Sequence, residues 1–194
     1  EALMEQAIGE IEELNHIIQD VLEVSRLQLK GLHIHPETMN LTLFLFELLE
    51  DYELSFEEHH LELSVDIPDE SVWIEADARL LKRLFSNLIS NSVKYAPGPG
   101  TFFLQLSETP DSILVTLRDQ GPGIAEQHLK SIFTPFYRIE DSRTRDKGGV
   151  GLGLTIAYEI VQAHSGEIQI HNRTAPEHGL EICIRLPRSP KSRT

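Results

Sequence analysis

The sequence contains a single cysteine, Cys183, among its 194 residues. One thiol cannot form an internal disulfide, so stabilisation by cross-links within the chain is excluded, and a reducing compartment is the simpler expectation. Cys183 lies in the apolar run 180–186, which predicts a small residue of the core and not a reactive thiol. The fold must therefore depend on its hydrophobic core, for which a content of 40% hydrophobic residues is sufficient.

Long apolar stretches and an excess of basic residues are also missing. No segment approaches the roughly 18 apolar residues of a membrane span, and none has the pattern of a signal peptide. The chain opens with Glu1 in the middle of a helical pattern, so we expect a piece of a longer protein. The formal net charge of -14 disfavours non-specific binding to nucleic acid or to an anionic membrane.

Hydrophobic periodicity and local composition divide the chain into four predicted parts. Residues 1–30 place apolar residues at spacings of three and four, which predicts a helix that packs in a bundle. The alternative is a helix that docks on its own domain. Residues 31–40 contain glycine and proline and predict a linker. Residues 41–187 predict a globular domain, and residues 188–194 predict a disordered tail.

Helical and strand patterns are mixed within the globular domain. Their order predicts an α+β sandwich, with helices on one face of a mixed, mostly antiparallel sheet. Asn40 and Asp77 are expected as helix N-caps, and Trp73 is expected in the core. The predicted helices cover 41–56, 78–95, 125–132 and 153–163, and the predicted strands cover 61–67, 72–74, 101–107, 113–118, 167–171 and 180–186.

The helix predicted over 78–95 carries a polar edge beside its apolar stripe. Asn87, Asn91 and Lys94 fall within an arc of roughly 60° at helical spacing. A carboxamide oxygen is a suitable ligand for Mg²⁺, and an ammonium group can neutralise phosphate charge. A solvated helix edge is the alternative. The apolar stripe consists of Leu81, Leu84, Phe85, Leu88 and Ser92.

Two glycine-rich segments follow this helix. DQGPGI (119–124) comes directly after a predicted strand, where the carboxylate of Asp119 can accept a hydrogen bond from an exocyclic amine such as that of adenine. GGVGLGL (148–154) opens a predicted helix, and backbone N–H groups in such a turn can bind an anion. Because it lacks Gly-Lys-Ser/Thr, it does not match the Walker pattern. Taken alone, DQGPGI can be an ordinary turn.

Between the glycine segments lie FTPFYR (133–138) and a charged loop that reaches residue 150. Phe133 and Phe136 can anchor one hinge of a lid while Arg138 faces the phosphates, and an aromatic turn packed on the core is the alternative. The loop over 137–150 has the composition of a mobile segment. The loop carries the cations Arg143, Arg145 and Lys147. One of them can meet a phosphate, and for each of them a charged residue of a solvated loop is the alternative.

Four of these segments together resemble the sequence boxes of bacterial sensor histidine kinases. NLISNSVKYA (87–96) resembles the asparagine box, DQGPGI the first glycine box, FTPFYR the phenylalanine box and GVGLGL (149–154) the second glycine box. They occur in the family's order. The resemblance implies the Bergerat or GHKL sandwich, shared with gyrase B, Hsp90 chaperones and MutL proteins. It also implies that residues 1–30 are the second helix of a dimerisation and phosphotransfer domain.

The resemblance implies ATP and Mg²⁺ as ligands and assigns roles by position. Asn91 resembles the Mg²⁺ ligand, Lys94 would contact phosphate, Tyr95 would stack on adenine, and Asp119 would read the adenine amine. The aromatic segment would anchor the lid, and the second glycine segment would form its hinge and the phosphate cradle. The implied ATP-binding residues are Asn87, Asn91, Lys94, Tyr95, Asp119, Gly121, Gly123, Ile124, Phe133, Phe136, Arg138, Gly149, Gly151, Leu152 and Gly153.

The phosphate-accepting histidine of the family is missing. That histidine is followed by Asp or Glu, whereas none of the nine histidines here is. His164 precedes Ser165 and Gly166 and resembles a structural helix end. The resemblance further implies a response regulator receiver domain as partner, a homodimer formed through the helical bundle, no nucleic acid, and a cytoplasmic domain of a protein anchored in the bacterial inner membrane by upstream segments.

Three alternatives remain from the sequence. A degenerate nucleotide sensor would dock on a partner without turnover, but Asn91, Asp119 and the glycine segments are intact. A gyrase-like or chaperone-like ATPase clamp is disfavoured by the N-terminal helix and by FTPFYR. An anti-sigma serine kinase would not carry the long helix in front.

Overall fold

The computed structural model describes residues 32–96, 98–139, 150–174 and 177–188, together with Met4, Ile11 and Ile18, which are helical and exposed. The bundle helix predicted over 1–30 and the tail predicted over 188–194 therefore lie almost entirely outside the described residues. The same holds for most of the charged loop.

The described part of the chain contains both helices and strands. In chain order they are β1 (Glu37–Asn40), α2 (Leu41–Glu50), α3 (Glu53–Glu58), β2 (Leu61–Asp66), β3 (Trp73–Ala76), α4 (Ala78–Tyr95), β4 (Gly100–Glu108), β5 (Ser112–Arg118), α5 (Glu126–Leu129), α6 (Gly153–Ala163), β6 (Glu167–Asn172) and β7 (Leu180–Pro187).

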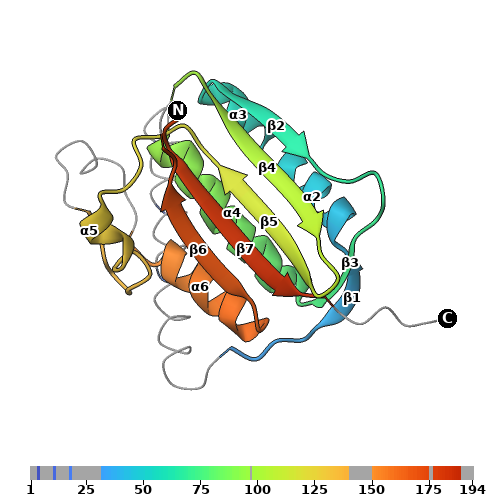
Figure 1. The fold of residues 1–194 in the computed structure, drawn as a ribbon. Coiled ribbons are helices and arrows are strands. Elements are labelled where there is room, and N and C mark those ends of the chain that lie inside the picture. The colour runs from blue at the N-terminus through green and yellow to red at the C-terminus, as the bar shows by residue number, and fades with distance from the viewer. Residues whose placement is uncertain are drawn as a thin grey trace.

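Five strands form one sheet in the order β2-β4-β5-β7-β6. Only β2 and β4 run parallel, and the other neighbours are antiparallel. A separate antiparallel pair joins β1 to β3. Helices α2, α4 and α6 all lie behind the same face of the sheet (Figure 1). The predicted α+β sandwich with a mixed, mostly antiparallel sheet is thereby confirmed.

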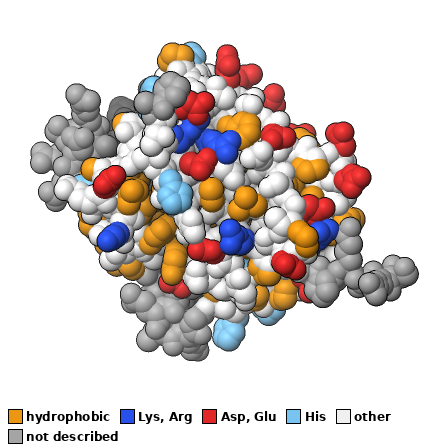
Figure 2. Space-filling model, in the orientation of Figure 1, with side chains coloured by type: hydrophobic (Ala, Val, Ile, Leu, Met, Phe, Trp, Pro, Cys, Tyr) orange, Lys and Arg blue, Asp and Glu red, His pale blue; other side chains and the backbone are white. Residues whose placement is uncertain are grey.

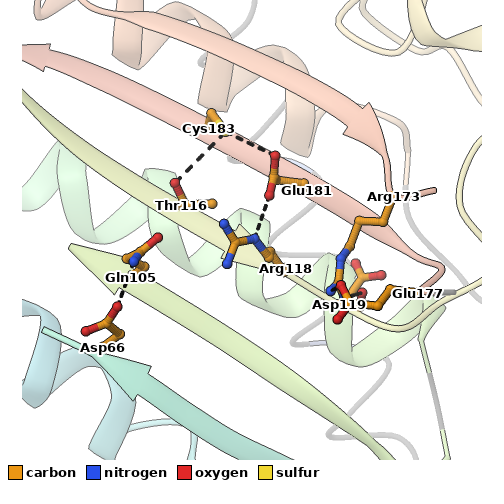
Figure 3. A network of polar contacts seen from close by, with 9 residues as sticks. All are labelled: Asp66, Gln105, Thr116, Arg118, Asp119, Arg173, Glu177, Glu181 and Cys183. Atoms are coloured by element: carbon orange, nitrogen blue, oxygen red, sulfur yellow. Dashed lines mark hydrogen bonds and ion pairs between the residues drawn. The ribbon is translucent and has the colours of Figure 1, made fainter. Parts of the chain in front are cut away.

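The core lies between the sheet and its helices because apolar residues alternate along the strands. In β4, Phe102 and Leu104 are completely buried, whereas Thr101 and Phe103, which alternate with them, lie on the other face and are half-buried. The same period of two places polar pairs on the open face of the sheet, including Arg118 with Glu181 on the neighbouring strand (Figure 3). Seen from this side, acidic, basic and apolar side chains are interspersed (Figure 2).

Helix α4 is the central helix, and its bounds agree with the prediction. Asp77 caps its N-terminus by accepting a hydrogen bond from Leu80 N at 3.2 Å, and the five residues of the predicted apolar stripe are all buried. Asn40 likewise caps α2 by accepting from Leu43 N. Both N-cap predictions are therefore confirmed, and α4 places its polar edge beside the core.

Four expectations need correction. Residues 37–40 of the predicted linker form strand β1, although the division into domains itself stays a prediction. The helix predicted over 41–56 is broken after Glu50, and Phe56 on the second piece stacks on Phe102 of the sheet at 5.3 Å. Trp73 is 56% exposed because Ile74 and Ala76 occupy the inward positions of β3. Cys183 faces the open side of the sheet and is half-buried, since its neighbours in β7 point into the core.

Candidate functional site

A buried carboxylate lies where β5 ends. Asp119 is 7% exposed, and its Oδ1 accepts hydrogen bonds from Gly121 N at 2.9 Å and from Leu180 N at 3.0 Å. Its Oδ2 accepts a third hydrogen bond from the Ser92 hydroxyl of α4 at 3.2 Å. These three donors fix the orientation of the carboxylate. An ionised carboxylate has about four lone-pair sites, so Oδ2 retains the capacity to accept a further hydrogen bond from an amine.

The first glycine segment packs directly on the end of α4. A Cβ atom on Gly121 would lie 2.9 Å from the Cβ of Ala96, so no larger residue fits without a shift. Just before Ala96, the Lys94 ammonium lies 5.5 Å from the centre of the Tyr95 ring, and that ring is partly exposed. Ala96, the residue directly after this pair, thus contacts the segment that holds Asp119.

The second glycine segment meets the same helix nearer its middle. Asn87 Nδ2 donates a hydrogen bond to the carbonyl of Gly153 at 3.2 Å, and α4 and α6 pack side by side. Asn91 lies one turn further along α4 and is half-buried. The helix that carries both asparagines thus touches Asp119 through Ser92 and the start of α6 through Asn87. Segments about 30 residues apart in sequence are both anchored on one helix.

Gly151 joins the aromatic segment to the start of α6. Its carbonyl accepts a hydrogen bond from Phe136 N at 3.1 Å. Its φ is +79°, and a Cβ atom would lie 2.7 Å from the Tyr137 carbonyl oxygen, so this position requires glycine. Leu152, the next residue, is 1% exposed and belongs to the core. The connection between the aromatic segment and α6 therefore leaves no room for a side chain at residue 151.

The aromatic segment is held by α6. The Phe133 carbonyl accepts a hydrogen bond from the Thr155 hydroxyl at 3.0 Å, and the Phe133 ring lies 5.2 Å from the ring of Tyr158. Phe136 is 56% exposed and has a left-handed φ of +63°, which is rare for a bulky residue and is associated with functional sites. Arg138 is exposed. This arrangement fits an anchor at one end of a lid.

Comparison with known proteins identifies the family. Residues 76–190 match the family described as histidine kinase-, DNA gyrase B- and HSP90-like ATPases. The chain belongs to this ATPase family. The matched range contains the asparagine edge of α4, Asp119 and both glycine segments.

Curated relatives and solved structures that are similar to the chain include sensor histidine kinases. The chain is 33% identical over 162 residues to the sensor histidine kinase WalK of Bacillus subtilis. This alignment covers 82% of the chain and 26% of WalK. The fold is similar to that of the Acinetobacter baumannii histidine kinase AdeS, with a TM-score of 0.79 and 22% identity over 98% of this chain and 86% of that one. The fold is also similar to that of histidine kinase ThkA in its complex with response regulator TrrA, with a TM-score of 0.76 and 24% identity. This match covers 95% of this chain and 50% of ThkA.

The comparisons confirm the resemblance to catalytic ATP-binding domains of two-component sensor histidine kinases. The chain spans only about a quarter of the length of WalK. Within the described part of the chain, no helix is both long enough and apolar enough to cross a membrane.

The sequence-predicted site residues of this ATPase domain fall into two connected groups. Asp119, Gly121 and Tyr95 lie around the end of α4, and Asn87 and Gly153 lie around its middle, with the aromatic segment attached through Gly151. Ile124 is half-buried, and it and Gly123 contact the β6–β7 hairpin. The predicted residues that lie outside the described part of the chain are Gly149, Arg143, Arg145 and Lys147.

Sequence reasoning missed four residues around Asp119. Ser92 was assigned only to the apolar stripe, yet it donates a hydrogen bond to the carboxylate. Asn172, Arg173 and Gly179 lie near the β6–β7 turn and contact residues 119–124. Nothing in their local sequence indicates more than a hairpin turn, because their partners lie about 50 residues earlier in the chain.

Two histidines in the described segments support the structure around the site. His128 Nδ1 lies 2.6 Å from the Tyr137 hydroxyl of the aromatic segment, within hydrogen-bond distance. His164 is buried: its Nε2 accepts a hydrogen bond from Asp77 N at 3.0 Å, so Nδ1 carries the proton that bonds the Ile160 carbonyl at 2.8 Å. The structural role expected for His164 is confirmed. Among the residues described, no cluster of three or more His, Cys, Asp or Glu side chains could hold a metal ion.

Proposed function

We propose that this chain binds ATP with Mg²⁺ and serves as the catalytic part of a protein-histidine kinase. The γ-phosphoryl group would pass from ATP to a histidine nitrogen of the dimerisation domain and then to an aspartate of a response regulator. One observation carries the proposal: α4 contacts both the Asp119 carboxylate and the start of α6. The proposed base-reading group and the proposed phosphate-facing helix start would thereby be held on one rigid element.

The residues around the middle and the C-terminal end of α4 fit the two ends of a nucleotide. Asp119 would accept the adenine amine, a contact that guanine, with its carbonyl at that position, cannot make. Tyr95 would stack on the base. The backbone of residues 151–153 at the start of α6 would face the phosphates, where helix N–H groups favour negative charge, and Lys94 would neutralise part of that charge.

Asn91 supplies the donor type that a magnesium site needs. Its carboxamide oxygen is a hard ligand, and Mg²⁺ in nucleotide sites commonly takes one or two protein ligands plus phosphate oxygens and water. The lack of an acidic or histidine cluster among the described residues fits a metal held mainly by substrate. When bound, Mg²⁺ would neutralise charge on the phosphates.

The role of the chain in the transfer would be positioning. In the reaction the bond between the γ-phosphorus and the β–γ bridging oxygen breaks, a phosphorus–nitrogen bond forms at the histidine, and ADP leaves. Asp119 and the glycine segments would orient ATP so that its γ-phosphate faces the incoming histidine. Closure of the lid anchored by Phe133 and Phe136 would exclude water, which would otherwise compete as the acceptor.

The partners follow from the same proposal. A receiver domain would accept the phosphoryl group, as the complex of ThkA with a response regulator suggests. A second copy would pair through the helical bundle that includes residues 1–30. Segments upstream of this chain would anchor the whole protein in the bacterial inner membrane.

Isothermal titration with ATP and Mg²⁺ tests the proposal. We expect heat of binding for the wild-type chain, and a loss of at least about tenfold in affinity for Asp119→Asn, because the amide presents a donor to the adenine amine. Asp111→Asn, at an exposed turn, is the matched control and should bind as the wild type does. Absence of heat with the wild-type chain would favour a docking module without nucleotide.

Radiolabelled ATP tests the missing nucleophile. Because no histidine of this chain is followed by an acidic residue, we expect no acid-labile phosphate on the chain after incubation with γ-labelled ATP and Mg²⁺. Appearance of acid-labile label on one of its own histidines would contradict this expectation.

A further inference from the structure

The side chain of Asn172 pairs with the backbone of the first glycine segment. At the end of β6, Asn172 Oδ1 accepts a hydrogen bond from Ile124 N at 2.8 Å, and its Nδ2 donates to the Ile124 carbonyl at 2.6 Å. A Cβ atom on Gly123 would lie 2.6 Å from the same Oδ1. The carboxamide therefore acts as a neighbouring strand would, because it satisfies both backbone polar groups of one residue, Ile124. This contact fixes the end of the segment 119–124.

Arg173 holds the other end of that segment. Its Nη1 donates a hydrogen bond to the Asp119 carbonyl at 3.2 Å, and its side chain is 15% exposed. The guanidinium also forms an ion pair with Glu177, whose side chain is 64% exposed. Figure 3 shows the guanidinium lying between the end of β6 and Asp119, with Glu177 beside it. A mostly buried cation is thus directed at the residue that carries the base-reading carboxylate.

The far side of the same turn closes on Asp119. A Cβ atom on Gly179 would lie 2.1 Å from the Asp119 carbonyl oxygen, so the backbones approach as closely as glycine allows. Leu180 N donates to Asp119 Oδ1 at 3.0 Å, and Asp119 N donates back to the Leu180 carbonyl at 3.0 Å. The β6–β7 turn therefore contacts the backbone and the carboxylate of Asp119 as well as Ile124.

We propose that the β6–β7 turn determines nucleotide selectivity by clamping the segment 119–124 at both ends. Asn172 and Arg173 are positioning residues: they act through Ile124 and Asp119 and not by contact with the nucleotide. Without the clamp, the Asp119 carboxylate would keep its hydrogen bonds from Ser92 and from Gly121 within the segment, but the backbone of the segment would move and the direction of the carboxylate would vary. The inference rests on the proposed binding of ATP, for which a fixed carboxylate direction discriminates adenine from guanine.

The first test compares nucleotide affinities of Asn172→Ala and Arg173→Ala with those of the wild-type chain. Loss of the two Asn172 hydrogen bonds should weaken ATP binding about tenfold, whereas GTP, measured by competition, should lose little. The ratio of the two dissociation constants should therefore fall. Arg185→Ala is the matched control, because Arg185 lies on the same hairpin, exposed, in a loose ion pair with Glu167 at 3.8 Å.

Asn172→Asp and Arg173→Lys separate positioning from folding. Aspartate keeps the shape of the side chain and the acceptor for Ile124 N, but its second oxygen would face and repel the Ile124 carbonyl, so the ATP preference should be lost as in Asn172→Ala. Lysine can still donate to the Asp119 carbonyl and should recover part of the ATP preference. Equal losses for ATP and GTP in all four variants would indicate a merely structural role and would overturn the proposal.

A second readout requires no nucleotide. Backbone amide hydrogen exchange of residues 119–124 in the free chain should accelerate about tenfold or more in Asn172→Ala, with α4 unchanged, and stay at the wild-type rate in Arg185→Ala. Unchanged exchange would overturn the clamp even if the wild-type chain binds ATP. A wild-type chain that binds no ATP would instead contradict the proposed function and, with it, the selectivity, whatever the exchange rates.

Discussion

Asp77 joins three parts of the chain, so its replacement should destabilise the domain measurably. Its carboxylate accepts hydrogen bonds from Leu80 N at 3.2 Å and from His35 N at 3.1 Å, and its own N–H donates to His164. Loss of an N-cap costs about 1 kcal/mol, and loss of a further hydrogen bond costs about 1 kcal/mol. Asp77→Ala should therefore lower the free energy of unfolding by about 2 kcal/mol.

The effect of Asp77 should depend on pH. Burial raises the pKa of this carboxyl, but hydrogen bonds from the backbone of His35 and Leu80 and the charge of Arg79 outweigh burial, so the pKa lies below its ordinary value of 3.8. A depressed pKa in the folded state stabilises the protein above the unfolded pKa, and that stabilisation is lost as pH falls through the folded pKa. The difference between wild type and Asp77→Asn should be constant at neutral pH and shrink below about pH 4.

Urea unfolding of wild type, Asp77→Ala and Asp77→Asn at several pH values provides the measurement. Asp51→Asn is a suitable control, because Asp51 forms an exposed ion pair with Lys82 at 2.8 Å and should contribute far less. An Asp77→Ala protein as stable as the control, or a difference between wild type and Asp77→Asn that grows as pH falls below 4, would refute this account of the cap.

Three further outcomes are expected. Gly151→Ala should destabilise by about 2 kcal/mol or more, because it combines a left-handed φ with a clash. The loss should exceed that of Gly98→Ala, where φ is also positive, at +110°, but the added methyl group meets nothing within 4 Å; equal stabilities in thermal unfolding would contradict this. Thr155→Val should cost about 1 kcal/mol by removing the hydrogen bond to the Phe133 carbonyl, with Thr155→Ser retaining most of it, and identical melting curves for the two would argue against that bond. Burial and the nearby charge of Glu181 raise the pKa of the Cys183 thiol, so alkylation by iodoacetamide at pH 8 should be slower than that of a free cysteine and should speed up in urea; a rate equal to that of free cysteine in the folded protein would be inconsistent with this environment.

Local pattern was sufficient to predict α4, α6 and most of the strands, because each buries one face with a regular period. Asp77 and Asn40 were found as caps since their role is satisfied within three residues. Trp73 was misplaced because a large aromatic residue suggested the core, whereas strand alternation assigns it to the outside. The break in the helix predicted over 41–56 depends on tertiary packing of Phe56 against the sheet, which no local pattern contains.

The candidate site was only partly predictable for the same reason. Asn87 and Asp119 were recognisable from their own segments. The contact of Asn87 with Gly153, 66 residues later, and the bond from Asn172 back to Ile124, 48 residues earlier, arise only when the sheet order brings β7 beside β5. Residues that support a site through another residue carry no chemical signature of their own, and a sequence pattern identifies them only as turns.

A crystal structure of this chain with a non-hydrolysable ATP analogue and Mg²⁺ tests the central claim most directly. The account predicts the adenine amine within hydrogen-bond distance of Asp119 Oδ2, the metal at the Asn91 carboxamide oxygen, and the phosphates facing residues 151–153. A nucleotide bound elsewhere, or an Asp119 carboxylate that contacts only protein groups while the nucleotide is bound, would contradict it.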